Sequence, residues 1–195
     1  MRFCSDCGEK LEVRQQGARQ QPVYYCRYCR QLSYQHPKLL VAAFINCGNK
    51  LLWMRRALAP KKGFWAIPAG FMEAGESMPQ AAARELLEET GVVIQPADLQ
   101  LYMVGSITFI SEVYIAFRAS VANENCCCGD ESLDVRFFSR EELPWDEVAY
   151  PEANNSIIQA YDDIERGAFG LYHAEMSAQK NLLVPVDYAP LPADQ

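Results

Sequence analysis

The chain has 195 residues, of which 50% are hydrophobic and 22% charged, and its formal net charge is −7. This length can form one full-sized hydrophobic core and a small appendage. Because no apolar run approaches the roughly 18 residues that a transmembrane helix needs, we expect no membrane span.

The first predicted element is a pair of cysteine knuckles. Cys4 and Cys7 are followed, after eighteen residues, by Cys26 and Cys29. This spacing is typical of a structural zinc site, in which each CxxC turn supplies two thiolates to a tetrahedral Zn²⁺, and Gly8 helps the first turn. A segment of about 35 residues buries too little apolar surface to fold alone, so the metal would supply much of its stability. The sequence therefore predicts a zinc ribbon.

Two other uses of these cysteines are a disulfide pair in an exported protein and a redox CxxC. The opening MRFCSDCGEK lacks the apolar stretch of an export signal, which argues against disulfides and leads us to expect a cytoplasmic protein. No thioredoxin-like βαβ pattern surrounds either pair, which weakens the redox interpretation.

Residues 1–38 are basic, with seven Lys or Arg against three Asp or Glu, whereas the rest of the chain holds 11 against 22. Four thiolates with one Zn²⁺ contribute −2, which reduces the surplus of +4 to about +2. Because binding through phosphates normally needs a larger basic patch, we do not expect nucleic acid as a partner. We expect a structural or dimer-forming ribbon, so a homodimer is one candidate assembly.

A hairpin and a further short strand are expected next. Residues 39–45 form a buried strand run, residues 46–49 a turn that contains Cys47, and residues 51–55 a second strand. Residues 63–70, with the sequence GFWAIPAG, read as a short apolar strand entering a loop that Pro68 and the glycines shape.

A helix is predicted from Ser77, a candidate N-cap with Pro79 in the first turn, to Gly91, a candidate C′ residue. On it Glu85, Glu88 and Glu89 are related as i, i+3 and i+4, so they project together. The opposite side would carry four residues fit for a core, namely Ala83, Leu86, Leu87 and Thr90. Like charges at i and i+4 cost roughly 0.2–0.5 kcal/mol per pair, which a bound Mg²⁺ or Mn²⁺ would reverse. The segment therefore predicts a site for a divalent cation and a diphosphate.

Shorter signals follow. Strands are expected at 92–94, 101–104, 112–119 and 134–138, and a helix at 153–166, where apolar residues recur at helical spacing before Gly167. After Gly170 the pattern fades, and the proline-containing end is expected to be an extended arm or disordered. Two helices against a mixed sheet give an α/β fold.

The residues from Gly70 to Val92 resemble the box of the Nudix hydrolases: a glycine, five residues, a glutamate, seven residues, then REUXEEXGU with U aliphatic. All nine fixed positions match, at Gly70, Glu76, Arg84, Glu85, Leu86, Glu88, Glu89, Gly91 and Val92. The alternative without a functional site is a surface helix whose carboxylates face solvent. The resemblance implies an α/β/α sandwich with a mixed sheet at residues 37–168, preceded by the ribbon at 1–36 and followed by an extension at 169–195.

The resemblance also implies an activity and roles. Nudix enzymes cleave a nucleoside diphosphate linked to another group, with water attacking phosphorus and Mg²⁺ or Mn²⁺ neutralising the phosphate oxygens. Glu85 and Glu89 would be metal ligands together with the carbonyl of Ala69 or Gly70. Glu88 would be a further ligand or the base that activates water. Arg84 would orient the carboxylates, and Glu76 would either join these tasks or brace the loop.

The wider chain is similar to bacterial and plant Nudix hydrolases with an N-terminal zinc ribbon, in segments such as FCSDCG, WAIPAGFMEAGES and SEVYIAFRA. Members of that group are associated with hydrolysis of FAD, ADP-ribose or NADH. The SQPWPFPxS array of the NADH branch is absent, since the corresponding stretch reads MVGSITFISEV. We therefore favour FAD or ADP-ribose, with NADH as the alternative. A nucleotide-sensing regulator and an enzyme that removes damaged nucleoside triphosphates are the other readings.

Further expectations concern single residues. Asp134 stands near a place where relatives contribute a late acidic ligand, with Glu131 as competitor, and both could instead lie on a solvated strand edge. Tyr34 and Trp65 are candidates to stack on the substrate base, although packing explains either as well. No role follows for His36, His173, Cys47 or the run Cys126, Cys127 and Cys128.

Overall fold

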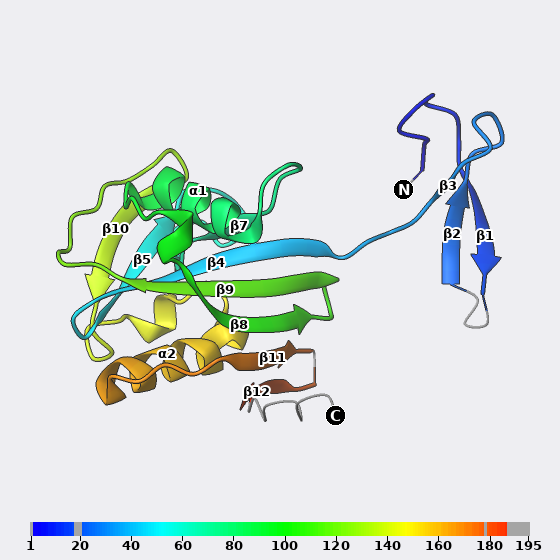
Figure 1. Cartoon of the computed structure of the whole chain (residues 1–195). Coiled ribbons are helices and arrows are strands. Elements are labelled where there is room, and N and C mark those ends of the chain that lie inside the picture. Colours follow the sequence, from blue (N-terminus) through cyan, green and yellow to red (C-terminus); the bar gives the residue numbers. More distant parts are fainter. Residues whose placement is uncertain (1, 18–20, 178, 187–195) are drawn as a thin grey trace, which may run out of the picture. The chain divides into compact units, whose positions relative to one another are not determined.

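The computed structural model describes residues 2–17, 21–177 and 179–186. The chain divides into two units, Met1–Pro37 and Lys38–Gln195, and each unit has its own sheet (Figure 1). The first unit is a three-stranded antiparallel sheet of β1 (Glu12–Gln16), β2 (Gln21–Tyr25) and β3 (Leu32–Ser33). Its core is very small: Cys4, Leu11 and Cys26 form one buried cluster, and Val23 is also buried. Such a unit depends on something other than apolar burial for its stability.

The second unit is built on a nine-stranded mixed sheet in the order β10-β5-β4-β9-β8-β11-β12, with β6 beside β5 and β7 beside β4. The pairs β4·β9 and β8·β11 are parallel, and the other pairs are antiparallel. The strands are β4 (Lys38–Cys47), β5 (Lys50–Arg56), β6 (Trp65–Ala66), β7 (Ala69–Phe71), β8 (Gln100–Ile107), β9 (Glu112–Ser120), β10 (Ser132–Phe138), β11 (Tyr172–Met176) and β12 (Asn181–Pro185).

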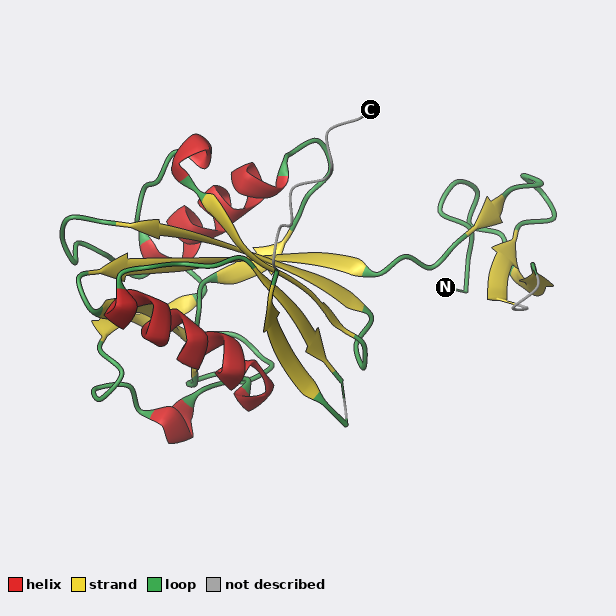
Figure 2. Ribbon diagram, turned by 60° about the horizontal axis from the view of Figure 1, so that its bottom comes forward, coloured by secondary structure: helices red, strands yellow, loops and turns green. Residues whose placement is uncertain are grey.

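Two helices cover the sheet, α1 (Met78–Thr90) and α2 (Asn154–Arg166), and Figure 2 shows helices on both of its sides. Short 3₁₀ turns lie at Pro96–Asp98, Trp145–Glu147 and Pro151–Ala153. None of the helices within residues 2–17, 21–177 and 179–186 is long and apolar enough to span a membrane.

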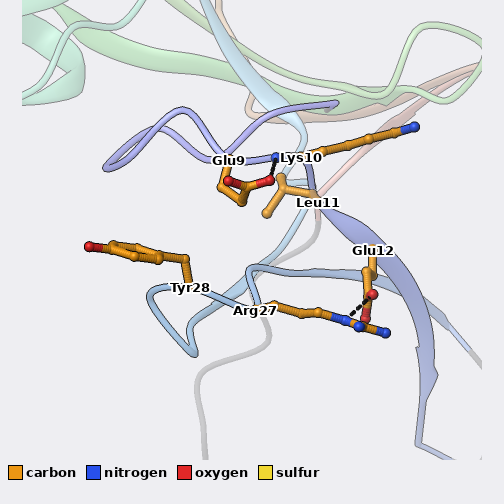
Figure 3. Close-up of a pocket in the computed structure, with 6 residues that line it drawn as sticks. All are labelled: Glu9, Lys10, Leu11, Glu12, Arg27 and Tyr28. Carbon is orange, nitrogen blue, oxygen red and sulfur yellow. Dashed lines mark hydrogen bonds and ion pairs between the residues drawn. The ribbon is translucent and has the colours of Figure 1, made fainter.

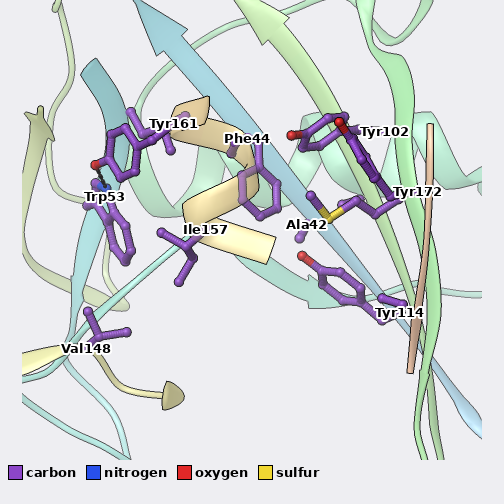
Figure 4. Close-up of a cluster of buried hydrophobic side chains, with 14 of the residues drawn as sticks. Ala42, Phe44, Trp53, Tyr102, Tyr114, Val148, Ile157, Tyr161 and Tyr172 are labelled. Carbon is purple, nitrogen blue, oxygen red and sulfur yellow. Dashed lines mark hydrogen bonds between the residues drawn. The ribbon is translucent and has the colours of Figure 1, made fainter. Parts of the chain in front are cut away.

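Strand β4 contributes side chains to the hydrophobic clusters on both faces of the sheet, because successive side chains in a strand point in opposite directions. Phe44 belongs to the cluster that includes Ile157 and Tyr161 of α2, whereas Ile45 belongs to the cluster that includes Leu86 of α1. Figure 4 shows the first cluster, which is rich in aromatic rings and holds a hydrogen bond from Trp53 Nε1 to Tyr161 Oη at 3.2 Å. The sheet is therefore buried on both faces, as its nearly continuous apolar strands predict.

The carboxylate of Asp163 ties helix α2 to two strands. It is fully buried and accepts hydrogen bonds from Tyr102 Oη of β8 at 3.0 Å and from Tyr172 Oη of β11 at 2.8 Å. Gln159 and Arg166 of the same helix also donate to it. A buried carboxylate needs such a set of donors, so this network fixes β11 against β8.

Two expectations are wrong in detail. Residues 92–94 form no strand, because the chain there runs from the left-handed Gly91 towards the 3₁₀ turn at Pro96–Asp98. The proposed extension after residue 168 is not a separate arm within its described part, since β11 and β12 join the main sheet. The end of the chain, residues 187–195, lies outside the described residues.

Candidate functional site

The four ribbon thiols converge on one point. Their sulfur atoms all lie within 4.8 Å of one another, and the Sγ atoms of Cys7 and Cys26 are 3.6 Å apart. Four Zn–S bonds of about 2.3 Å in a tetrahedron place sulfurs about 3.8 Å apart, so the spacing fits Zn²⁺. The backbone N–H groups of Asp6 and Cys7 lower the pKa of Cys4 to about 7, which favours its thiolate, whereas the Cys7 thiol raises the pKa of Cys29. These residues can therefore hold the predicted zinc.

The residue that follows each CxxC turn differs between the two knuckles. Gly8 follows the first CxxC with φ of 75°, and Arg30 follows the second with φ of 58°. The turns are alike: Cys4 N–H donates to the Glu9 carbonyl at 2.8 Å, and Cys26 N–H to the Gln31 carbonyl at 2.9 Å. The second knuckle thus places a non-glycine residue in the left-handed region, at some cost in backbone strain.

An open hollow of about 610 Å³ lies on the ribbon and is lined by Glu9, Lys10, Leu11, Glu12, Arg27 and Tyr28 (Figure 3). Its Arg27 is already paired with Glu12. The hollow contains no residue of the acidic helix face, so its size alone does not make it the site of chemistry.

The acidic helix α1 begins and ends as the sequence predicts. Ser77 N–H donates to Gln80 Oε1 at 2.8 Å, and Pro79 lies in the first turn. Gly91 ends the helix with φ of 68°, and its N–H donates to the Leu87 carbonyl at 2.9 Å. The buried side of α1 consists of Ala81, Ala82, Leu86, Glu89 and Thr90. Leu87 is 49% exposed rather than part of the core.

Gly70 lets the site form. The carboxylate of Glu85 lies so close to it that a Cβ on residue 70 would stand 2.1 Å from Glu85 Cδ. Burial raises the pKa of Glu85, and the nearby Arg84 opposes that rise. The glycine therefore brings a desolvated carboxylate directly onto the backbone of β7.

Glu89 is the most deeply placed carboxylate of the group, at 4% exposure. One of its oxygens accepts the Ala69 N–H at 2.9 Å. Burial raises the pKa of Glu89 to about 8, the Ala69 N–H opposes this, and the charges of Glu85 and Glu131 add to it. A buried carboxylate that also faces other carboxylates is a place where a divalent cation would be stabilising.

Arg84 holds the outer carboxylates. It donates to Glu76 Oε1 and to Glu85 Oε1 at 2.8 Å each, to Glu88 Oε2 at 3.2 Å, and to the carbonyl of Phe71 at 3.1 Å. The pKa of Glu76 is lowered by Arg84 and by the Glu73 N–H. Glu88 remains largely exposed, with 57% of its side chain accessible. The guanidinium thus orients three carboxylates, and Glu89 is not among its hydrogen-bond partners.

The site brings together carboxylate oxygens, the hydrogen-bonded guanidinium of Arg84 and the exposed backbone at Gly70. Hard oxygen ligands of this kind suit a divalent metal ion and a phosphate ester or anhydride. The sequence profile of the NUDIX domain matches residues 35–160, well over half of the chain. The chain belongs to the Nudix family.

Among the relatives of this Nudix chain is an ADP-ribose pyrophosphatase from Methanocaldococcus jannaschii, 34% identical over 115 residues that cover 57% of this chain and 67% of that protein. The NAD-capped RNA hydrolase NudC from Vibrio atlanticus is 29% identical over 171 residues, which cover 86% of this chain and 60% of NudC. The chain thus spans about three fifths to two thirds of the length of these curated relatives.

A solved structure gives the same fold. The NUDIX hydrolase from Nitrosomonas europaea matches with a TM-score of 0.80 and 37% identity, covering 90% of this chain and 99% of that one. The Nudix α/β/α sandwich preceded by a cysteine ribbon is therefore the fold of this protein.

Glu131 and Asp134, the two candidates for a late acidic residue, have different surroundings. The charge of Glu131 raises the pKa of both Glu85 and Glu89, so its carboxylate lies near theirs. Asp134 instead pairs with Arg136 at 2.8 Å and accepts the Val135 N–H. Asp134 therefore already has partners of its own on β10.

The two stacking candidates have different surroundings. Trp65 is 4% exposed and packs edge-on against Phe138 at a centroid distance of 4.8 Å, so it belongs to the core and cannot stack on a substrate. Tyr34 is 47% exposed and donates to Gln16 Oε1 at 3.4 Å. Its ring remains accessible on the ribbon, and its role in binding stays a prediction.

An aromatic residue that the sequence reasoning missed stands beside the Nudix site. Phe71 follows Gly70 directly, is 42% exposed, and has the Lys38 ammonium 4.6 Å from its ring centroid. An exposed ring with a neighbouring cation suits a base joined to phosphates. The sequence signal that could have identified Phe71 is its position directly after Gly70, within the Nudix box.

Proposed function

We propose that this protein hydrolyses the pyrophosphate bond of a nucleoside diphosphate derivative and releases a nucleoside monophosphate. The observation that carries the proposal is a pair of carboxylates, the partly buried Glu85 and the buried Glu89, which lie against Gly70 and Ala69. Arg84 orients the outer carboxylates. This donor set fits Mg²⁺ or Mn²⁺.

In the proposed reaction Glu85, Glu89 and the carbonyl of Ala69 or Gly70 hold the cation. When bound, the cation would neutralise the phosphate oxygens and orient the attacking water. Glu88, whose side chain is exposed, would act as a further ligand or accept a proton from water. Arg84 keeps Glu85 and Glu88 in position through its paired N–H donors.

ADP-ribose or FAD is the favoured substrate. The name of the M. jannaschii relative supports ADP-ribose, whereas FAD rests on the likeness to zinc-ribbon Nudix hydrolases. The NudC relatives, which align over as much as 86% of this chain, support a second candidate in which the substrate carries a nicotinamide dinucleotide, as NADH or as an RNA cap.

A substrate panel tests the proposal. ADP-ribose, FAD, NADH, NAD-capped RNA, coenzyme A and deoxynucleoside triphosphates would be incubated with the zinc-loaded protein and Mg²⁺ or Mn²⁺, and the products separated. We expect metal-dependent AMP release from ADP-ribose or FAD, and a loss of at least about 100-fold in Glu88→Gln and Glu89→Gln. Equal turnover in the wild type and both variants would refute the roles.

The rival is a nucleotide-sensing regulator that binds without turnover. It would show saturable binding of ADP-ribose with no product from any member of the panel. All box carboxylates and Arg84 are present in this chain, which favours an enzyme.

We further propose that the ribbon, residues 1–36, holds Zn²⁺ through Cys4, Cys7, Cys26 and Cys29 and precedes a Nudix domain that starts at residue 37. A cytoplasmic homodimer is the proposed state. Light scattering of the zinc-loaded protein would show twice the mass of the 22.0 kDa chain.

A further inference from the structure

We propose that Tyr114 binds the nucleoside part of the substrate through its hydroxyl group and so helps to decide which nucleotide derivatives the protein accepts. The inference rests on the proposed function, which supplies the diphosphate that anchors the ligand. Tyr114 lies on β9, is 7% exposed and belongs to the hydrophobic cluster of Figure 4.

Tyr114 differs from the other buried tyrosines in its hydrogen bonding. The buried tyrosines of the described residues are Tyr102, Tyr114, Tyr161 and Tyr172. The hydroxyls of Tyr102 and Tyr172 donate to Asp163, and that of Tyr161 donates to the Phe138 carbonyl at 2.9 Å. The Tyr114 hydroxyl has no partner in the part of the chain that the structure describes, and burial alone raises the pKa of Tyr114. Buried polar groups normally have a partner, and a bound ligand would supply one here.

The hydroxyl oxygen of Tyr114 is still within reach of a ligand. Within residues 2–17, 21–177 and 179–186, Asn154 Oδ1 is the one fully enclosed side-chain oxygen or nitrogen that lacks a hydrogen-bond partner. Tyr114 Oη also lacks a partner, so it is not fully enclosed and accounts for part of the exposed 7% of the residue. A polar atom that reaches an opening from apolar surroundings is typical of the few groups that orient a ligand in its pocket.

Strand pairing places Tyr114 in one row with a residue of the Nudix box. Leu40 of β4 pairs with Phe71 of β7 on one side and with Tyr114 of β9 on the other. Residues paired in this way share a face of the sheet, and two strand spacings separate the Cα atoms of Tyr114 and Phe71 by about 10 Å. Exposure falls along this row, from 42% at Phe71 to 7% at Tyr114. The row thus leads from the surface towards the unpaired hydroxyl.

The outer end of this row adjoins the candidate metal site. Phe71 directly follows Gly70, against which the Glu85 carboxylate lies. A diphosphate held beside Gly70 can therefore extend its nucleoside over Phe71 and Leu40 towards Tyr114. The hydroxyl can donate to, or accept from, a sugar hydroxyl or a base nitrogen. A substrate that lacks the matching atom would leave this hydroxyl unpaired, which is a source of selectivity.

The test compares two probes that differ by the nucleoside. Full-length, zinc-loaded wild type, Tyr114→Phe and Tyr161→Phe would be titrated calorimetrically with α,β-methylene-ADP and with methylenediphosphonate, each with Mg²⁺. We expect Tyr114→Phe to bind α,β-methylene-ADP about three- to tenfold more weakly than the wild type does, with unchanged affinity for methylenediphosphonate. Tyr161→Phe is the matched control, because it changes a buried tyrosine outside the row, and it should keep both affinities.

Stability separates this role from a structural one. Tyr114→Phe removes a hydroxyl without a partner, so the urea concentration at the unfolding midpoint should stay the same or rise. Tyr161→Phe removes the donor to the Phe138 carbonyl and should lower the midpoint. A lower midpoint in Tyr114→Phe would show that its hydroxyl supports the fold and would overturn the inference.

Three binding results would also overturn the inference: equal affinity of the wild type and Tyr114→Phe for α,β-methylene-ADP, an equal loss for methylenediphosphonate, or no binding of α,β-methylene-ADP to the wild type. The methylene bridge is not hydrolysed, so binding is read without turnover. A protein whose binding depends on Tyr114 but that hydrolyses nothing would refute the proposed function and leave this inference standing.

Discussion

At the scale of single residues, the site depends on how closely side chains approach the backbone. The Glu85 carboxylate occupies the space that a Cβ would take at Gly70, and Glu89 reaches the N–H of Ala69. Both contacts join the helix to β7, the strand that holds the candidate carbonyl ligands. A small substitution at this junction should therefore reduce cation affinity more than it reduces the stability of the fold.

Gly70→Ala should weaken Mn²⁺ binding by about tenfold or more, because the added methyl group would displace the Glu85 carboxylate. Calorimetric titration of Mn²⁺ would measure the change. Gly48→Ala is the matched control, since the β4–β5 turn has nothing within 4 Å of the added atom. The control should lose about 1 kcal/mol of stability through its positive φ and keep its Mn²⁺ affinity.

Glu89 should make the metal-free protein less stable as pH rises. Its pKa is about 8 in the folded state against an ordinary value of 4.5, so between these values the folded state holds a proton that the unfolded state has lost. The free energy of unfolding should fall by the order of a few kcal/mol over that window and level off above it. Urea unfolding from pH 5 to 8.5 without added Mg²⁺ or Mn²⁺ measures this fall. Glu89→Gln should show a shallower slope, and parallel curves would contradict the assignment.

The sequence predicted which glutamates share a helix face, but it could not show how far each enters the protein. Spacing places Glu85, Glu88 and Glu89 together, yet Glu89 is buried and Glu88 is 57% exposed. The rotation of α1 against the sheet decides this, and that rotation depends on residues distant in sequence. The same limit applies to Trp65, whose burial follows from contact with Phe138.

At the scale of elements, local signals predicted the hairpin, the two helices and the mixed sheet. They failed after Gly170, because β11 is held by a parallel pairing with β8, a strand about seventy residues earlier in the chain. Parallel pairing between distant segments leaves little local pattern. The buried Asp163 that joins these strands likewise reads in the sequence as an ordinary polar residue of an amphipathic helix.

Tyr172→Phe should lower the free energy of unfolding by about 1–3 kcal/mol, since the hydroxyl that donates to the buried Asp163 would be lost. Urea denaturation would measure the loss. Tyr28→Phe, the same substitution on a side chain that is 79% exposed, should change stability by less than about 0.5 kcal/mol. Mn²⁺ affinity should stay unchanged in both, and a weakened affinity in Tyr172→Phe would show that α2 also supports the site.

Arg30→Gly should slow release of the proposed zinc from the ribbon, because glycine adopts the φ of 58° without a Cβ penalty. Gly8→Ala is the complementary change and should accelerate zinc release. Competition with a chromogenic chelator gives both rates. Faster release from Arg30→Gly than from the wild type would mean that the arginine side chain itself supports the knuckle.

At the scale of the whole molecule, the chain carries two units with different sources of stability. In its described part the Met1–Pro37 unit buries few residues, namely Cys4, Leu11, Val23 and Cys26, whereas the Lys38–Gln195 unit buries both faces of a nine-stranded sheet. The stability of the first unit should depend on the Zn²⁺ that we propose it binds, and that of the second on apolar burial.

Removal of zinc should therefore unfold the ribbon and leave the Nudix domain folded. Hydrogen exchange before and after chelation would show lost protection in β1 and β2, with protection kept in β4 and β9. A simultaneous loss of hydrogen-exchange protection in the strands of both units would refute the independence of the two units.

The position of β11 has a consequence for synthesis. On a ribosome, β8 emerges long before Tyr172–Met176, and until those residues arrive one side of β8 offers unpaired amide and carbonyl groups. The growing polypeptide would thus pass through a stage in which its enzymatic helix is complete and its sheet is still open. A premature stop codon after Gly167 should therefore give insoluble product, even though every residue of the Nudix box would already have been translated.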